Sequence, residues 1–95
     1  MTDRTTARAR VATTSADRYA KQLSSHLGRR SEVREASDGT VIVLANGECR
    51  LVSQAESLEL YASAPTREDL ERVMEVVGKH LERFGQRNEL TVTWE

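Results

Sequence analysis

The segment at residues 31–64 constrains the fold most, because its apolar residues recur at every second position. That period places alternate side chains on opposite faces of a β-strand. Turn residues interrupt the pattern at short spacing, as Asp38-Gly39, as Asn46-Gly47 and across residues 54–57. We therefore predict an antiparallel meander of four strands joined by short turns. The strands are expected at residues 31–36, 40–44, 48–53 and 58–62.

Before the meander, residues 16–27 show the period of an amphipathic helix. The apolar stripe consists of Ala16, Tyr19, Ala20, Leu23 and Leu27. Thr14 or Ser15 can cap the first turn, because their hydroxyls accept from free backbone amides. Gly28 follows the stripe, where a left-handed C-cap residue is favoured.

A second helix is predicted after Pro65. Thr66 and Asp69 have the spacing of a capping box, with Asp in the position that usually holds Glu. The apolar stripe consists of Leu70, Val73, Met74, Val77, Leu81 and Phe84, and Gly85 ends it.

Two further strands are expected, at residues 6–13 and 89–94, which gives the order β-α-β-β-β-β-α-β. Each helix has one apolar stripe and each strand one apolar face, and all of them need a common partner. We therefore predict an α+β two-layer sandwich, an antiparallel sheet with both helices on one face. Its single core should contain Leu23, Leu51, Leu60, Val77 and Leu81.

The length of 95 residues allows one domain, which we place at residues 7–95 after a disordered stretch at residues 1–6. The first residues include no apolar stretch, so we expect no signal peptide. The longest apolar run, residues 41–45, is too short to cross a bilayer. The single cysteine cannot form an internal disulfide. These features favour a location in the cytoplasm.

Charge is unevenly distributed, although the net charge is only −1. Residues 1–34 hold eight basic and three acidic groups, a net charge of +5, and residues 35–95 hold six basic and twelve acidic groups, a net charge of −6. The two parts can neutralise each other in the fold, or the first third can form a patch that attracts anions.

His26 and His80 are the only histidines, and each lies at the edge of its helical stripe. If the helices pack side by side, the two imidazoles approach each other at the rim of the helix–sheet interface. Cys49 could join them in a metal or catalytic site. The alternative is that both histidines bond to backbone carbonyls and Cys49 is a small buried apolar residue.

No closely spaced ligand pair, nucleophile motif or phosphate-binding glycine loop occurs in the sequence. We therefore expect no catalytic residues, no bound metal and no cofactor, and we favour a chain that is not an enzyme.

The sheet face opposite the helices is predicted to carry Arg8, Arg10, Arg34 and Arg50 together with Val52 and Tyr61. Such a face can meet an anionic ligand or a protein partner. It can also be a solvent-exposed face whose long side chains cover apolar surface.

Four motifs occur in an order that resembles a known family: Arg18-Tyr19 with Lys21-Gln22-Leu23 and His26, then Gly47-Glu48-Cys49-Arg50-Leu51, then His80-Leu81-Glu82-Arg83-Phe84, and finally Leu90-Thr91-Val92-Thr93-Trp94. Over residues 7–95 the chain resembles a small bacterial family known as domain of unknown function 2218. The resemblance implies a compact α+β fold, and it implies no catalytic residues. It also implies an association with siderophore and iron-uptake proteins.

Together these observations favour a small non-enzymatic binding or accessory domain, linked to iron–siderophore utilisation and present as a monomer or weak dimer. The expected ligand or partner surface consists of Arg18, Tyr19, His26, Arg50, Tyr61, His80 and Arg83. The partner would be a protein or a small molecule of iron uptake, not a membrane. One alternative is the site of His26, His80 and Cys49. A second is anion or nucleic-acid binding by the basic first third, with few aromatic rings available for base stacking.

Overall fold

The computed structural model describes residues 4–95, which form one antiparallel sheet and two helices. The elements in chain order are β1 (Thr5–Ala12), α1 (Ala16–Leu27), β2 (Glu32–Ala36), β3 (Gly39–Leu44), β4 (Gly47–Ser53), β5 (Ser57–Ala64), α2 (Arg67–Phe84) and the 3₁₀ turn η1 (Gln86–Asn88). The four predicted meander strands and both helices are confirmed.

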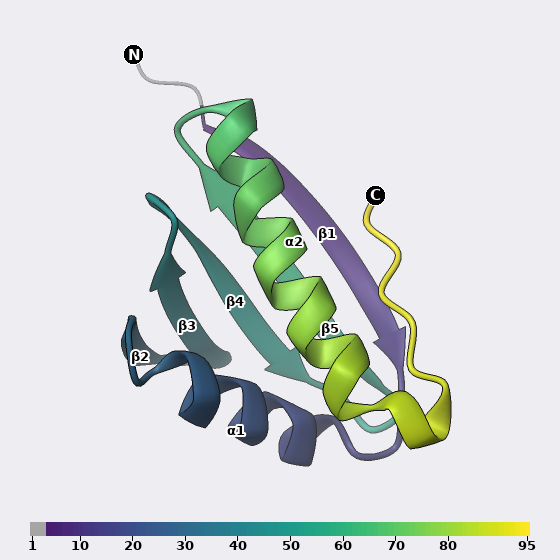
Figure 1. Ribbon diagram of the computed structural model, residues 1–95. Helices are drawn as coiled ribbons and strands as arrows, with labels where there is room; N and C mark the ends of the chain where they lie inside the picture. The colour runs from purple at the N-terminus through teal and green to yellow at the C-terminus, as the bar shows by residue number, and fades with distance from the viewer. Residues whose placement is uncertain (1–3) are drawn as a thin grey trace.

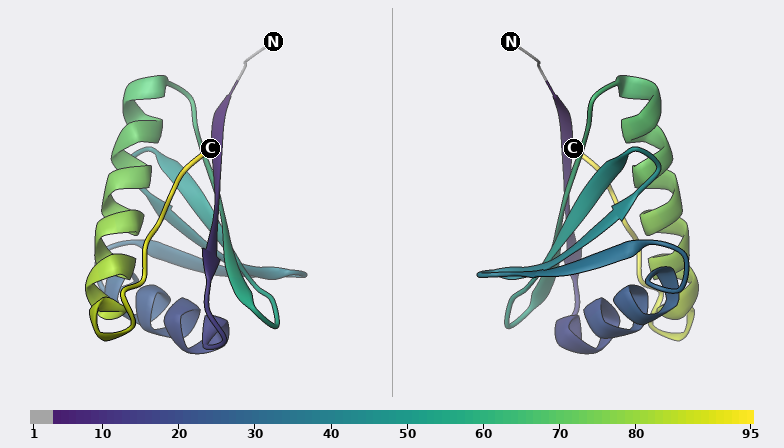
Figure 2. Two further views of the ribbon diagram at one scale, coloured as in Figure 1. Left: turned by 90° about the vertical axis from the view of Figure 1, so that its right-hand side faces the viewer. Right: turned by 90° about the vertical axis from the view of Figure 1, so that its left-hand side faces the viewer.

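The strands lie in the spatial order β1-β5-β4-β3-β2, and every neighbouring pair is antiparallel. Both helices lie on the same face of this sheet, α2 along β5 and α1 across the lower end of the strands (Figure 1). The side views show that the other face carries no helix, and that the sheet twists strongly from β1 to β2 (Figure 2). The predicted two-layer α+β architecture is therefore confirmed.

One continuous core fills the space between the sheet and the helices. Leu23 of α1, Leu51 and Leu60 of the sheet, and Val77 and Leu81 of α2 are each at most 1% exposed. They belong to a single buried cluster, as their periodicity predicted. Aliphatic side chains supply most of this cluster, so the hydrophobic effect acts through many contacts of moderate size.

The turn between β3 and β4 differs from the prediction by one residue. Ala45 and Asn46, not Asn46 and Gly47, have the positive φ values, 50° and 63°. Gly47 has a negative φ and is needed for a different reason: a Cβ there would lie 2.5 Å from the carbonyl oxygen of Ser63. Gly28, predicted as a left-handed cap, is right-handed with φ −65°.

The two helix starts are capped differently. At α2 the Thr66 hydroxyl accepts a hydrogen bond from the Asp69 backbone N–H at 3.1 Å, as predicted. At α1 the capping residue is Ser15, whose side chain makes no capping bond. Instead the Thr13 hydroxyl accepts from the Ser15 backbone N–H at 3.0 Å, which fixes the chain just before the helix.

The chain after α2 forms a clasp, the name used below for residues 89–95. The predicted strand at 89–94 is reduced to one antiparallel bridge between Ala9 and Trp94. Two backbone hydrogen bonds between Arg8 and Glu95, at 2.7 and 3.3 Å, flank that bridge. The segment cannot pair further with β1, because the Val92 N–H donates to the Glu82 carboxylate on α2 instead.

The sheet begins earlier than predicted. Thr5 and Thr6 are the first residues of β1 and pair with Ala64 and Ser63 of β5, although both were assigned to the disordered stretch and the strand was predicted from residue 6. That correction follows from the length of β5, which offers backbone partners as far as Ala64. Residues 1–3 of the predicted disordered stretch lie outside the described residues. Within residues 4–95 neither helix has the length and apolar character needed to span a membrane.

Candidate functional site

The structure brings the two histidines together where α1 ends beside α2. The imidazole centroids of His26 and His80 are 4.9 Å apart, with the rings tilted by 45°. Phe84 lies edge-on to His26 at 5.5 Å and completes a cluster of three rings. His26 is exposed and His80 is half-buried, so the pair faces solvent from the rim of the helix layer.

The orientation of His80 is fixed by its own helix. Its Nδ1 lies 2.7 Å from the carbonyl oxygen of Val76, one turn earlier. A carbonyl oxygen only accepts, so Nδ1 carries the hydrogen and donates it. In the neutral ring Nε2 then keeps the lone pair, and in the protonated ring Nε2 becomes a second donor.

Two hollows adjoin the histidines and share His26 and Arg29 in their linings. One, of about 490 Å³, is lined by His26, Leu27, Arg29, Arg30, Ser31, Leu44, Ala45, Arg72, Val76 and His80. The other, of about 470 Å³, is lined by Arg18, Lys21, Gln22, Ser25, His26, Arg29 and Phe84. We call the two together the rim site. Every lining side chain that can carry a charge is basic.

None of the ion pairs in the described part of the chain involves Arg18, Lys21, Arg29, Arg30 or Arg72. Arg72 nevertheless acts on Glu75, as a smaller effect than that of Lys79. Two acids of α2 are engaged in other contacts. Glu75 pairs with Lys79 at 2.9 Å, which lowers the pKa of Glu75 and raises that of Lys79. Glu82 accepts from the Val92 N–H at 2.9 Å.

Cys49 does not take part in this site, so the structure gives no support to the alternative in which it joins the two histidines. It lies on β4 with its side chain fully buried in the core. Burial raises the pKa of its thiol to about 12, far above the range in which a thiolate forms readily. Among residues 4–95 no group of three or more His, Cys, Asp or Glu side chains is placed to hold a metal ion.

Three of the four arginines predicted on the open face of the sheet lie in one row, whereas Arg10 pairs with Glu59 in another. The strand registers align Arg8, Tyr61, Arg50, Val41 and Arg34 across all five strands. The guanidinium carbon of Arg50 lies 5.0 Å from the centroid of the Tyr61 ring, a cation–π contact.

Tyr61 also makes a hydrogen bond along its own strand. Its hydroxyl donates to Glu59 at 2.6 Å, and this bond raises the pKa of Tyr61. The Tyr61 phenol is therefore held in its neutral form, and its hydroxyl hydrogen is engaged by Glu59.

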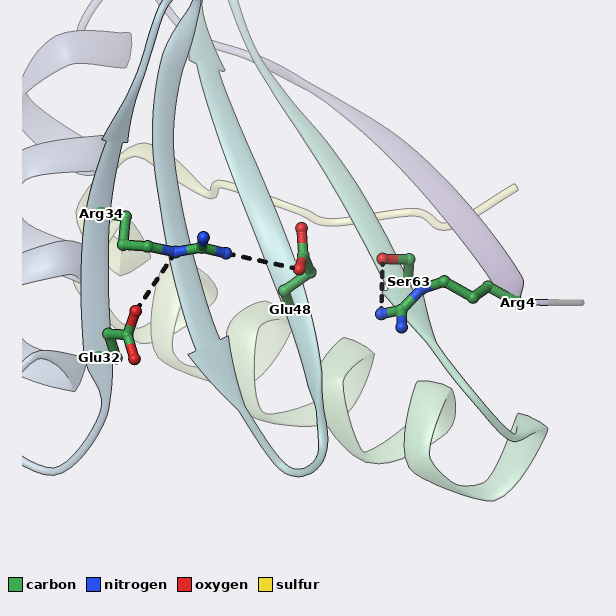
Figure 3. Close-up of polar contacts among 5 residues, drawn as sticks. All are labelled: Arg4, Glu32, Arg34, Glu48 and Ser63. Atoms are coloured by element: carbon green, nitrogen blue, oxygen red, sulfur yellow. Dashed lines mark hydrogen bonds and ion pairs between the residues drawn. The ribbon is translucent and has the colours of Figure 1, made fainter. Parts of the chain in front are cut away.

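Acidic residues neutralise much of the open face, in contrast to the rim site. Arg34 contacts Glu32 at 3.3 Å and Glu48 at 3.8 Å, and Arg50 contacts Asp38 at 3.5 Å. Figure 3 shows the Arg34 pairs beside the hydrogen bond from Arg4 to Ser63. A hollow of about 690 Å³ lies over this face, and the charged side chains that line it are Arg8, Arg50, Glu48 and Glu95.

The remaining predicted site residues lie in different parts of the structure. Tyr19 is corrected from surface to core: it is 5% exposed, and its hydroxyl accepts from the Asn88 side chain at 2.9 Å. Arg18 lines the rim site, whereas Arg83 is exposed near the end of α2 and lines neither hollow.

Three arginines of the rim site, Arg29, Arg30 and Arg72, were not among the residues predicted at the ligand surface. Arg29 and Arg30 directly follow Gly28, three and four residues after His26, a spacing that places them near that ring. Arg72 precedes His80 by eight residues, close to two helical turns, so the two share a face of α2. The spacing was therefore a usable signal, although the packing of α1 against α2 was needed to unite the two groups.

Comparisons with known proteins give a family and a fold. The profile of a family described as uncharacterised proteins conserved in bacteria matches residues 8–95. The NMR structure of PA4090 from Pseudomonas aeruginosa is similar, with a TM-score of 0.77 and 25% sequence identity, covering 100% of this chain and 96% of that one. No curated protein matches the chain.

Proposed function

The chain belongs to the bacterial family DUF2218, whose proteins are uncharacterised, and from that premise we propose a function based on the rim site. The protein is a non-enzymatic binding module that holds a small anionic molecule between the end of α1 and the middle of α2. One observation carries the proposal: two adjoining hollows share His26 and Arg29, and every chargeable side chain lining them is basic.

The chemistry of the lining suits oxyanions. A guanidinium presents N–H donors in a planar fork that matches a carboxylate or phosphate group. Arg29, Arg30 and Arg72 supply such donors around one hollow, and none of them is held by an ion pair within residues 4–95. Each hollow is within the range of small-molecule sites, roughly 300–1,000 Å³.

The narrower form of the proposal concerns iron. The resemblance to the family implied an association with siderophore utilisation, and ferric complexes of carboxylate or catecholate chelators are anions. An accessory role in the cytoplasm, as a monomer or weak dimer, fits a small domain whose one cysteine is a buried free thiol. In this form the ligand is an anionic ferric chelate.

Nucleic acid receives less support from the placement of the basic first third. Arg8 and Arg34 lie in the row on the open face, whereas Lys21 and Arg29 line the rim site on the helix layer. A nucleic-acid backbone needs cations along one continuous surface. The basic first third is divided between two faces and offers no such surface.

The test is a titration followed by backbone amide resonances at low salt, with sulfate, citrate and a ferric catecholate chelate as three separate ligands. We expect the amides of Leu27, Arg29 and Ser31 to shift together with that of Val76. The double variant Arg29→Gln, Arg30→Gln should weaken binding by about tenfold or more per arginine, because a charged hydrogen bond contributes about 1.5–3 kcal/mol.

The matched control is Arg8→Gln, Arg10→Gln, which removes the same charge from the open face and should leave binding within about twofold, because screening weakens charges more than about 10 Å away. Equal loss in both double variants would contradict the rim site. If none of the three anions binds, the proposal fails. If sulfate and citrate bind and the ferric chelate does not, only the iron form fails.

A further inference from the structure

We infer that anion binding at the rim site is coupled to the uptake of protons by His26 and His80. This inference rests on the proposed function and adds its regulation. The two imidazoles are the titratable groups of the hollow that can change charge between about pH 5 and pH 8. Both line the same hollow, and their centroids are 4.9 Å apart.

The hydrogen bond of His80 determines which ring nitrogen can take up a proton. Nδ1 already donates to the Val76 carbonyl oxygen at 2.7 Å, so the position left to protonate is Nε2. Protonation therefore adds a donor and a positive charge on the side of the ring that does not face the helix backbone. Val76 and His80 both line the hollow, so this change occurs at its wall.

None of the residues that line the two hollows is acidic, although Arg18 and Lys21 also line a neighbouring hollow with Asp17, Glu35 and Asp38. From α1 and the residues after it, Arg18, Lys21, Arg29 and Arg30 face the two hollows, and Arg72 does so from α2. The β3–β4 turn contributes Leu44 and Ala45, which are uncharged.

The other charged side chains of α2 near His80 make contacts of their own or lie outside the hollows. Lys79 is paired with Glu75, Glu82 is bonded to the Val92 N–H, and Arg83 is exposed outside the hollows. No carboxylate lines either hollow, so a bound anion would bring a negative charge into the hollow that both imidazoles line.

Linkage then fixes the sign of the pH dependence. An anion in the hollow is attracted more strongly to imidazolium than to imidazole, so the protonated protein binds it more tightly. Reciprocally, the bound anion increases protonation of the histidines. Affinity must rise as the pH falls through the range in which imidazole titrates, by up to about tenfold per pH unit for each proton taken up.

Calorimetric titration with sulfate tests this, because sulfate keeps its charge over the whole range. Repeating the titration in buffers of different ionisation enthalpy counts the protons taken up on binding. We expect a net uptake of protons on binding, with an upper limit of two because two imidazoles line the hollow. The dissociation constant should rise by about tenfold or more between pH 5.5 and pH 7.5, as that linkage requires.

Two variants separate the histidines from the arginines. His80→Gln should reduce the proton count and flatten the pH dependence while sulfate still binds at pH 7.5. Arg30→Gln should weaken binding at every pH and leave the proton count unchanged. Amide spectra confirm that each variant is folded, and the buffer comparison on the unmodified protein needs no variant.

The outcomes are distinguishable from those of the proposed function. Sulfate binding with no proton uptake and no dependence on pH overturns the coupling and leaves the anion site standing. No sulfate binding at any pH overturns both. A proton count that persists in the double variant His26→Gln, His80→Gln also overturns the coupling, because the protons then come from other groups.

Discussion

At the scale of single residues, Cys49 shows how position decides chemistry. The same thiol at the rim of the helices would ionise near neutral pH and bind metals. On β4 it faces the core, where desolvation raises its pKa to about 12 against the lowering effect of a backbone hydrogen bond. It therefore behaves as a small apolar residue, the second of the two roles that the sequence left open.

Cys49 predicts a loss of stability in alkali. An unfolded cysteine ionises at about 8.5, whereas the folded thiol stays neutral until about 12. Between those values the unfolded state holds fewer protons, so the free energy of unfolding falls as the pH rises. Urea denaturation between about pH 8.5 and pH 11 should show a slope steeper than that of Cys49→Ala by up to about 1.4 kcal/mol per pH unit. Parallel curves would contradict the burial of the thiol.

Residue patterns predicted burial well and turn geometry less well. The alternation of Leu58 and Leu60 required one dry face, and the structure has it. The turn is formed by Ala45 and Asn46, and Gly47 follows it at a position where the Ser63 carbonyl oxygen of β5 leaves no room for a Cβ. That contact joins two residues sixteen positions apart in the sequence. The residues next to the turn in the sequence do not indicate this contact.

The candidate site could be predicted in part for the same reason. The stripe edges placed His26 and His80 at the helix rim, since periodicity fixes which face a residue occupies. Tyr19 was assigned both to the apolar stripe and to the ligand surface. Its burial follows the stripe, and its hydroxyl accepts from Asn88, a contact across 69 residues that no local pattern indicates. Arg72 was missed because its role depends on the packing of α1 against α2.

At the scale of elements, the clasp joins three parts of the fold. Trp94 bridges to Ala9 on β1, and the Glu82 carboxylate of α2 holds Val92. Gly78 makes room for this packing, because a Cβ there would lie 3.3 Å from the indole nitrogen of Trp94. The clasp therefore fixes α2 against the edge of the sheet through one aromatic side chain.

Removing that ring should destabilise the fold. Trp94→Ala is expected to lower the free energy of unfolding by about 2–4 kcal/mol, because a large half-buried side chain is lost from the contact with α2. Thr93→Ala is the matched control: Thr93 is exposed, and its loss should stay within about 0.5 kcal/mol. Urea midpoints followed by circular dichroism measure both. Equal midpoints would mean that the clasp contributes nothing.

At the scale of the whole molecule, the sheet has two unlike edges. The clasp bonds to the outer side of β1, whereas β2 ends the strand order at the other side. Charged side chains occupy β2 at Glu32, Arg34 and Glu35, and Val33 is 36% exposed. Charges on an open edge oppose pairing between the edges of two copies.

Removing those charges should cause association. The triple variant Glu32→Val, Arg34→Val, Glu35→Val is expected to raise the apparent mass in light scattering above that of the unmodified protein, because the edge becomes apolar and strand-forming. Arg8→Val with Arg10→Val on β1 is the control, and its mass should stay the same. A triple variant of unchanged mass would mean that the twist of β2, not its charge, prevents pairing.

The hydrogen bonds between the clasp and β1 also affect where a further strand could be added to the sheet. The backbone of Glu95 in the clasp already occupies the hydrogen-bonding positions beside Arg8. An extended peptide that pairs beside β1 would therefore have to displace the backbone of Glu95 and the bridge between Ala9 and Trp94. Beside β2 it would meet no paired strand within residues 4–95, only the charged side chains of that edge.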